Sequence, residues 1–351
     1  MEKALQNLIE RLEQEHGLSE AGYTRLLRER CPQAAALLAK KAVEARKAVY
    51  GNAVFARGLI EISNICKNDC YYCGIRRSNQ SCVRYRLTPE QILACAREGY
   101  ALGFRTFVMQ GGEDPWFTDA RLCALIEAIK ACCPDCAVTL SLGERSRESY
   151  RRLRLAGADR YLLRHETADS AHYAMLHPAE MSFDNRMRCL RDLKKLGYQV
   201  GCGFMVGAPH QTEEMLAKDL KFIERFKPDM CGVGPFIPHH ATPFRDEPAG
   251  TAELTCYLLS IIRLIHPPVL LPATTALGTI HPRGRELGLL AGANVVMPNL
   301  SPVAVRKQYE LYDNKLCTGE ESAQCRDCLD ARVRSVGCTL VIARGDIKQE
   351  L

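Results

Sequence analysis

Residues 59–74 have the sequence Leu-Ile-Glu-Ile-Ser-Asn-Ile-Cys-Lys-Asn-Asp-Cys-Tyr-Tyr-Cys-Gly. The first five residues predict a short β-strand, because apolar and β-branched side chains lie there between residues that break strands. Cys66, Cys70 and Cys73 follow with the spacing Cys-x3-Cys-x2-Cys, on the loop after the carboxyl end of that strand. Parallel α/β folds collect their active sites at this end of the strands, so the cysteines predict a reactive site there.

Three thiolates on one loop suit a single metal centre. A four-iron cluster usually takes four thiolates, so three would leave one iron without a protein ligand. An open coordination position distinguishes a reactive metal site from a structural one. The alternatives are a zinc knuckle or three unrelated thiols. Zinc sites often pair two Cys-x2-Cys units roughly 15–20 residues apart, and no second pair lies at that distance here.

Composition predicts a globular protein with a large core. The chain has 351 residues, of which 47% are hydrophobic and 25% charged. The apolar runs are too short to span a bilayer, and the opening Met-Glu-Lys is not typical of a secretory signal. Eighteen cysteines without such a signal favour reduced thiols in the cytoplasm of an anaerobe over a disulfide framework. The net charge of +6 is spread out, which disfavours nucleic-acid binding.

Strand-like and helix-like segments alternate along the chain. Thr88 and Thr212 have the character of helix N-caps, and several helices are expected to end at a glycine, namely Gly103, Gly157, Gly197 and Gly292. The expected strands are eight in number and cover residues 59–63, 106–109, 137–141, 160–163, 200–206, 230–233, 269–273 and 293–297.

This alternation predicts an α/β protein with a (β/α)8 TIM-type barrel. A doubly wound open sheet remains an alternative, because periodicity does not show closure. We expect residues 1–50 to form helices packed on the outside, residues 51–301 to form the barrel, and residues 302–351 to form an irregular C-terminal extension.

Polar residues follow several of the expected strands, where a barrel would bring them together. Each has a structural alternative: a simple turn, a hydroxyl satisfied by backbone, an internal ion pair or a solvated helix face. The candidates after the second, third and fourth strands and at the next helix are Gln110, Gly111, Gly112, Thr139, Ser141, Arg164, Glu166 and Arg186.

The cysteine spacing, with an aromatic residue before the third cysteine, resembles the radical S-adenosylmethionine (SAM) enzymes. In that family three thiolates hold a 4Fe–4S cluster whose open iron chelates SAM. Further segments resemble the HydE family of FeFe-hydrogenase maturases, over about residues 45–330. They are Gln-Gly-Gly-Glu-Asp-Pro, Thr-Leu-Ser-Leu-Gly-Glu, Arg-Tyr-Leu-Leu-Arg-His-Glu-Thr-Ala, Pro-Phe-Ile-Pro-His, Pro-Ala-Thr-Thr-Ala and Ala-Asn-Val-Val-Met-Pro-Asn.

The resemblance implies a role for each matching residue. Cys66, Cys70 and Cys73 would hold the 4Fe–4S cluster. SAM would be surrounded by Gln110, Gly111, Gly112, Thr139, Ser141, Glu166 and Arg186. The substrate would lie in the lumen against Arg57, Arg160, Arg164, Thr274, Thr275, Ala276, Met297 and Tyr309. The family often has serine where Gly111 stands, so one hydroxyl contact near SAM would be missing.

A second cysteine group lies in the C-terminal extension, where Cys317, Cys325 and Cys328 are spaced Cys-x7-Cys-x2-Cys. In part of the HydE family such a trio holds a second iron–sulfur cluster at the surface that activity does not need. The alternative is scattered thiols in a cysteine-rich chain. We assign no role to the cysteines at 132, 133 and 136.

The resemblance also implies a reaction and partners. SAM would be cleaved reductively to a 5′-deoxyadenosyl radical that acts on an iron–cysteine organometallic precursor of the hydrogenase two-iron subcluster with its dithiomethylamine bridge. The implied partners are a tyrosine-lyase radical SAM maturase, a scaffold GTPase and a low-potential electron donor, with no nucleic acid and no membrane.

Three alternatives compete with this function. Methylornithine synthase and biotin synthase belong to the same group of enzymes, but biotin synthase needs a second cluster inside the barrel, and the sequence shows no cysteine set for it. An electron carrier with two clusters is the alternative outside enzymes.

Overall fold

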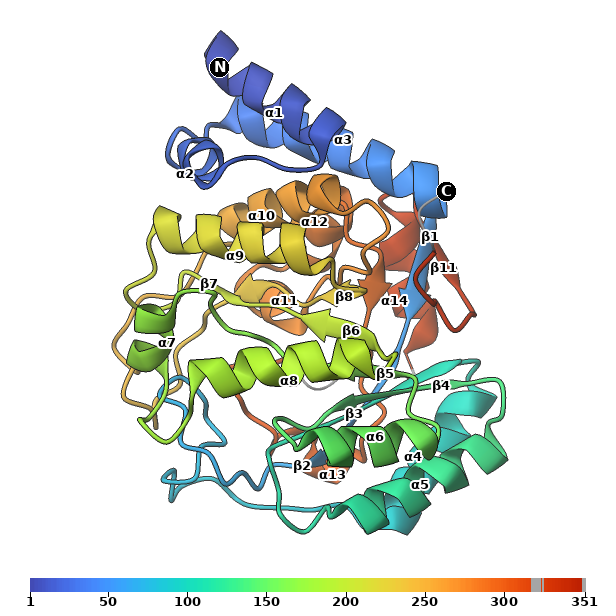
Figure 1. Ribbon diagram of the computed structural model, residues 1–351. Helices are drawn as coiled ribbons and strands as arrows, with labels where there is room; N and C mark the ends of the chain where they lie inside the picture. The colour runs from blue at the N-terminus through green and yellow to red at the C-terminus, as the bar shows by residue number, and fades with distance from the viewer. Residues whose placement is uncertain (317–322, 324, 349–351) are drawn as a thin grey trace.

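The computed structural model describes residues 1–316, 323 and 325–348 (Figure 1). Three helices precede the barrel: α1 (Lys3–Glu15), α2 (Glu20–Arg28) and α3 (Pro32–Tyr50). They lie outside the ring of strands, where α3 packs along α10 (Ala252–Ile265) and α2 along α9 (Glu213–Phe226). These helices bury apolar faces on the outer layer, so they cover the barrel without entering it.

Six strands form a continuous parallel sheet in chain order. They are β2 (Gly58–Ser63), β3 (Thr106–Gly111), β4 (Ala137–Ser141), β5 (Arg160–Leu162), β6 (Gln199–Cys202) and β8 (Met230–Cys231). Two further short strands, β7 (Met205–Val206) and β9 (Gly234–Pro235), pair beyond β6 and β8.

Hydrogen bonds close this sheet into a ring. Leu270 bridges to Met230, and Pro272 bridges to Val295 in β10 (Val295–Val296). β10 pairs in parallel with β1 (Ala53–Ala56), which leads into β2, and Leu59 bridges to Asn299. The ring confirms the expected barrel and excludes the open sheet.

The seventh strand is weaker than the sequence predicts. Residues 269–273 contribute only isolated bridges, and Pro272 has no N–H to donate to a neighbour.

Nine helices lie between the strands of the barrel in the described part of the chain. Besides α9 and α10 they are α4 (Pro89–Ala101), α5 (Asp119–Cys132), α6 (Arg147–Leu155), α7 (Ser170–Leu176), α8 (Phe183–Lys195), α11 (Thr275–Ile280) and α12 (Gly284–Leu290).

The expected helix ends are confirmed. Thr88 accepts from the backbone of Gln91 in a capping box, and Thr212 accepts from Met215. The four expected C-terminal glycines all have positive φ. No helix within the described ranges has the length and apolar content to cross a membrane.

The segment after residue 301 contains α13 (Val303–Arg306), α14 (Arg326–Arg334) and β11 (Thr339–Val341). β11 pairs with β1 on the side opposite β10. Residues 308–316 cross the carboxyl end of the barrel, where the carbonyl of Leu311 accepts from Gly74 at 2.8 Å and the N–H of Asp313 donates to Pro238 at 3.1 Å. The same segment therefore contributes to both ends of the barrel, since residues 344–348 bind at the amino end.

Gly203 separates β6 from β7, and its replacement tests how closely the strand ends pack. Its φ is +152°, and a Cβ there would lie 2.0 Å from the carbonyl oxygen of Gly232. We expect Gly203→Ala to lower the free energy of unfolding by more than about 2 kcal/mol. Gly197→Ala is the control, because its φ is +75° but nothing lies within 4 Å of the added Cβ, and it should cost only about 1 kcal/mol. Urea unfolding measures both, and equal losses would contradict the packing constraint.

Candidate active site

A cavity of about 350 Å³ opens at the carboxyl ends of the barrel strands, and Cys66, Cys70 and Cys73 all line it. Burial raises the pKa of each thiol, that of Cys70 to about 12. The backbone N–H of Glu113 lies 3.4 Å from Cys66 Sγ. The unliganded thiols would therefore remain protonated at neutral pH, while a bound metal centre would hold them as thiolates. Three thiols on one loop at one cavity fit an iron–sulfur cluster with an open iron.

Charged groups hold the cysteine loop in shape. Arg76 donates two hydrogen bonds to Asp69, at 2.8 and 2.7 Å, and the Arg76 hydrogen bond outweighs burial to lower the pKa of that carboxyl. Arg84 donates to four backbone carbonyls of the loop and its surroundings. A Cβ at Gly112 would lie 2.4 Å from the carbonyl oxygen of Ile65, so only glycine lets β3 approach this loop so closely.

Every residue proposed to surround SAM lines the same cavity: Gln110, Gly111, Gly112, Thr139, Ser141, Glu166 and Arg186. Thr139 Oγ1 is buried without a hydrogen-bond partner, and Glu166 Oε2 has only the ion pair of 3.1 Å with Arg164 Nη2. Arg186 is held on the cavity wall, since it donates to Glu144 and to the carbonyl of Arg164, both at 2.6 Å. Buried polar atoms usually have partners, so the oxygen of Thr139 indicates a polar ligand.

Seven of the eight residues proposed for the substrate also line the cavity: Arg57, Arg164, Thr274, Thr275, Ala276, Met297 and Tyr309. Arg164 Nη2 forms an ion pair of 3.1 Å with Glu166 Oε2, and Arg164 Nε has no hydrogen-bond partner. Arg57 is 4% exposed, and burial together with the charge of Arg160 lowers its pKa. Arg57 Nη1 lies 2.9 Å from the sulfur of Met230, and Nε has no partner. The lumen thus holds two cationic groups with hydrogen-bonding capacity left for an anion.

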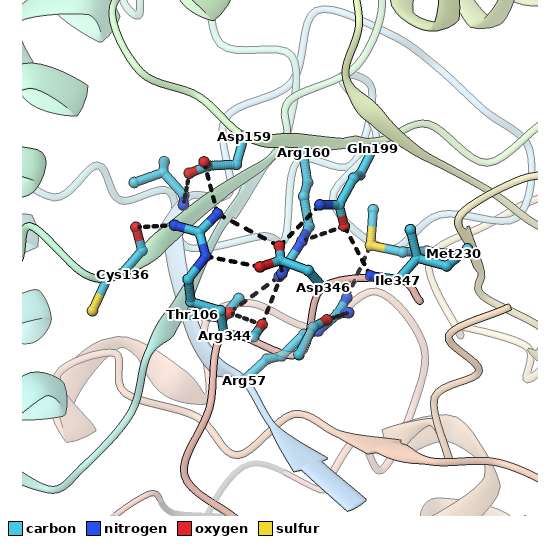
Figure 2. Close-up of polar contacts among 12 residues, drawn as sticks. Arg57, Thr106, Cys136, Asp159, Arg160, Gln199, Met230, Arg344, Asp346 and Ile347 are labelled. Carbon is cyan, nitrogen blue, oxygen red and sulfur yellow. Dashed lines mark hydrogen bonds and ion pairs between the residues drawn. The ribbon is translucent and has the colours of Figure 1, made fainter. Parts of the chain in front are cut away.

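Arg160 does not line the cavity, so the structure does not support its predicted place in the substrate site. Its side chain is fully buried at the amino end of β5 and lies 2.6 Å from Asp346 (Figure 2). It also donates to Thr106, Gln199 and the carbonyl of Arg344. The C-terminal segment neutralises this arginine and separates it from the lumen.

Three charged residues of the cavity were missing from the sequence-based set, namely Glu61, Glu113 and Lys315. Glu61 and Lys315 both line it and form an ion pair of 2.5 Å. Glu61 also accepts from Asn299 at 2.9 Å, and Lys315 Nζ donates to the carbonyl of Tyr309 at 2.8 Å. A glutamate inside the apolar strand Leu-Ile-Glu-Ile is a signal of a polar lumen, and it was available in the sequence. Lys315 comes from the C-terminal extension, and the strand pattern gave no signal of it.

The second cysteine group is only partly described. Cys317 lies outside the described residues, while Cys325 and Cys328 form a disulfide next to the start of α14, with Cα atoms 5.5 Å apart. Neither of these two lines the cavity, and within the described ranges its only cysteines are those of the loop after β2. A second cluster at the tail stays a prediction.

Comparison with known proteins relates the chain that carries this cysteine loop to radical SAM enzymes. The model of the radical SAM superfamily matches residues 60–223. The FeFe hydrogenase maturase subunit HydE of Thermotoga maritima is 45% identical over 300 residues, which cover 86% of this chain and 85% of that protein. The 3-methylornithine synthase of Methanosarcina barkeri is 32% identical over 272 residues, covering 76% of this chain and 75% of that protein.

Among solved structures, that of methylornithine synthase (PylB) superposes with a TM-score of 0.83 at 27% identity, covering 95% of this chain and 97% of that one. The fold and the three-cysteine loop define a radical SAM enzyme. At the level of identity given above, the chain belongs to the HydE family of hydrogenase maturases.

The ion pair at the amino end of the barrel predicts a pH dependence of stability. Burial opposes ionisation of Asp346, but the hydrogen bonds from Arg344 and the charge of Arg160 outweigh it and lower the pKa of this carboxyl. The ionised carboxylate of Asp346 therefore stabilises the folded state fully at pH values above its unfolded pKa of about 3.9. This stabilisation is lost as the pH falls toward the lower folded pKa.

We expect Asp346→Asn to lower the Tm at pH 7 by roughly 2–6 °C, because Arg160 then stays buried without its charge partner. The difference from wild type should shrink below about pH 4. Asp246→Asn is the control, since this carboxylate is 90% exposed. A Tm difference that persists unchanged at pH 2 would contradict the electrostatic account.

Proposed function

We propose that this enzyme cleaves SAM reductively and acts on an iron–cysteine organometallic species with carbonyl and cyanide ligands, on the way to the two-iron subcluster of FeFe hydrogenase. One observation carries the proposal: the three cysteines and all seven residues of the SAM set lie around one cavity, whose remaining wall holds Arg57 and Arg164. A 4Fe–4S cluster bound by Cys66, Cys70 and Cys73 would supply the electron for cleavage of SAM to methionine and a 5′-deoxyadenosyl radical.

The residues of the wall would bind and orient SAM. Thr139 Oγ1 offers a free hydrogen-bonding position, and Glu166 Oε2, which pairs with Arg164, would accept a further hydrogen bond. Arg186 is fixed by Glu144 and stands on the same wall, so its charge favours a carboxylate there. Burial of the cavity keeps water from reactive species, and residues 308–316 cover its mouth.

The substrate would lie deeper, between Arg57 and Arg164. Thr274 accepts from the backbone N–H of Leu277 as the N-cap of α11, and both Thr274 and Thr275 line the cavity. Two guanidinium groups and apolar neighbours such as Met230 and Met297 suit a compact anionic complex with apolar ligands. The proposed partners are a tyrosine-lyase radical SAM maturase that supplies the substrate, a scaffold GTPase that accepts the product, and a low-potential electron donor, all in a reducing cytoplasm.

Methylornithine synthase is the second candidate, and the match over 97% of its solved structure favours it. The identity of 45% to HydE against 32% to 3-methylornithine synthase favours maturation. Incubation of the reconstituted protein with lysine and SAM separates the two, because only the synthase would form methylornithine.

Replacement of a cluster cysteine tests SAM cleavage. We expect Cys70→Ala to abolish formation of 5′-deoxyadenosine under anaerobic reduction, since two thiols cannot hold the cluster in its reactive form. Cys95→Ala is the matched control, because Cys95 is buried on α4 but does not line the cavity. Chromatography of the products measures both. Full cleavage by Cys70→Ala would remove this loop from the mechanism.

Replacement of Arg164 tests the substrate site. Arg164→Ala should still bind SAM within a few-fold of wild type but should lower hydrogenase maturation at least about 30-fold, since a desolvated charge pair lost on one side costs about 2–5 kcal/mol. Arg151→Ala is the control, because this arginine pairs with Glu148 on the exposed face of α6. A reconstituted maturation assay with SAM binding measured in parallel gives the answer, and undiminished maturation would exclude Arg164 from the substrate site.

A further inference from the structure

Arg164 and Glu166 line the cavity, while His165 between them points the opposite way, into the barrel wall. His165 is fully buried. Its ring lies between two phenylalanines, with ring centroids 4.7 Å from Phe222 and 5.8 Å from Phe204. The mechanism described above uses its two neighbours and leaves this histidine without a role.

The backbone at this point is strained. Glu166 has a φ of +66°, a left-handed conformation that side chains with a Cβ adopt at a cost. Such a conformation persists only where the surrounding structure fixes it. Glu166 lines the cavity in this conformation.

Hydrogen bonds behind the wall fix that conformation. The N–H of Gly203 donates to Nδ1 of His165 at 3.2 Å, and the N–H of Glu166 donates to the carbonyl of Gly203 at 3.0 Å. Because Nδ1 accepts, the proton of the neutral ring lies on Nε2. Nε2 donates to Oδ1 of Asp219 at 3.2 Å, and the same oxygen accepts from the N–H of Ala168 at 2.5 Å.

Asp219 comes from the outer helix α9 and has no exposure to solvent. Its side chain therefore ties residues 165 and 168 to the helix layer from behind, on both sides of the strained Glu166. A buried carboxylate is costly, and burial raises the pKa of Asp219. A leucine would fill the same space at this position without a buried charge. The carboxylate of Asp219 therefore points to a role in geometry.

We propose that His165 and Asp219 form a positioning pair that holds Glu166 in the geometry that binds SAM. The inference rests on the proposed function, because it takes Glu166 as a contact of SAM. Neither His165 nor Asp219 touches the cavity, so both act through the backbone of residues 164–168.

The test measures the dissociation constant of SAM on anaerobically reconstituted protein, together with the change that SAM causes in the EPR signal of the reduced cluster. Asp219→Leu removes the oxygen that accepts from His165 and Ala168, and the new side chain has a similar volume. His165→Phe keeps the aromatic packing but removes both hydrogen bonds of the ring. Each should weaken SAM binding about 10–100-fold, the usual loss for groups that orient a ligand's direct contacts. The double variant should lose little more, since the two residues act as one unit.

Two controls separate positioning from folding. Asp219→Asn keeps Oδ1 as an acceptor and should bind SAM within about 3-fold of wild type, about 0.7 kcal/mol or less. Asn294→Leu removes a fully buried amide whose Oδ1 likewise accepts one side-chain and one backbone N–H, from Arg263 and Leu271. It should lower the Tm and leave SAM affinity unchanged.

Wild-type affinity in folded Asp219→Leu and His165→Phe would overturn the proposal, and so would an affinity for Asp219→Asn as low as for Asp219→Leu. If Asp219→Leu does not fold, His165→Phe decides the question alone. Failure of the wild type itself to bind SAM would instead overturn the proposed function.

Discussion

Closure of the parallel sheet is the constraint on which the rest of the structure depends. The N–H of Leu59 donates to Pro298 at 2.9 Å, and the carbonyl of Leu59 accepts from Leu300 at 2.7 Å, so the first barrel strand is bonded to the chain that follows the last. Because the ring is closed, loops that lie far apart in the sequence face one lumen. The cysteine loop after β2 thereby meets the side chains that follow β3, β4 and β5.

Charged side chains inside the closed ring lose contact with water, which costs free energy. Arg57, Arg160 and Arg164 differ in the partners that offset this cost. Arg160 at the amino end is neutralised by Asp346 from the C-terminal segment. Arg57 is buried and keeps an unpartnered Nε, while Arg164, whose side chain is 33% exposed, pairs with Glu166. Since an isolated buried charge favours an opposite charge, Arg57 gives the lumen a preference for anions. The C-terminal segment thus sets which arginines remain available, besides covering the mouth through Lys315 and Glu61.

Much of the fold was predictable because the local sequence signals for strands and helix ends agree with the barrel that the whole chain forms. Strand-like runs alternate with helices that begin at threonine caps or end at glycines, and this alternation predicts the barrel. For the site, alternation along a strand shows which side chains point inward but not their height along the barrel axis. Arg160, Leu162 and Arg164 share one side of β5 and its extension, yet only the latter two reach the cavity. Tertiary contacts of the tail, such as Asp346 with Arg160 and Lys315 with Glu61, join residues over 180 positions apart, and no local pattern reveals them.

The most direct test of the account adds this protein to a hydrogenase maturation system from which the HydE subunit has been left out. The account predicts that the wild-type protein, reconstituted with its cluster and supplied with SAM and a reductant, restores hydrogenase activity together with formation of 5′-deoxyadenosine. Release of 5′-deoxyadenosine without any restored hydrogenase, accompanied by methylornithine from added lysine, would contradict it.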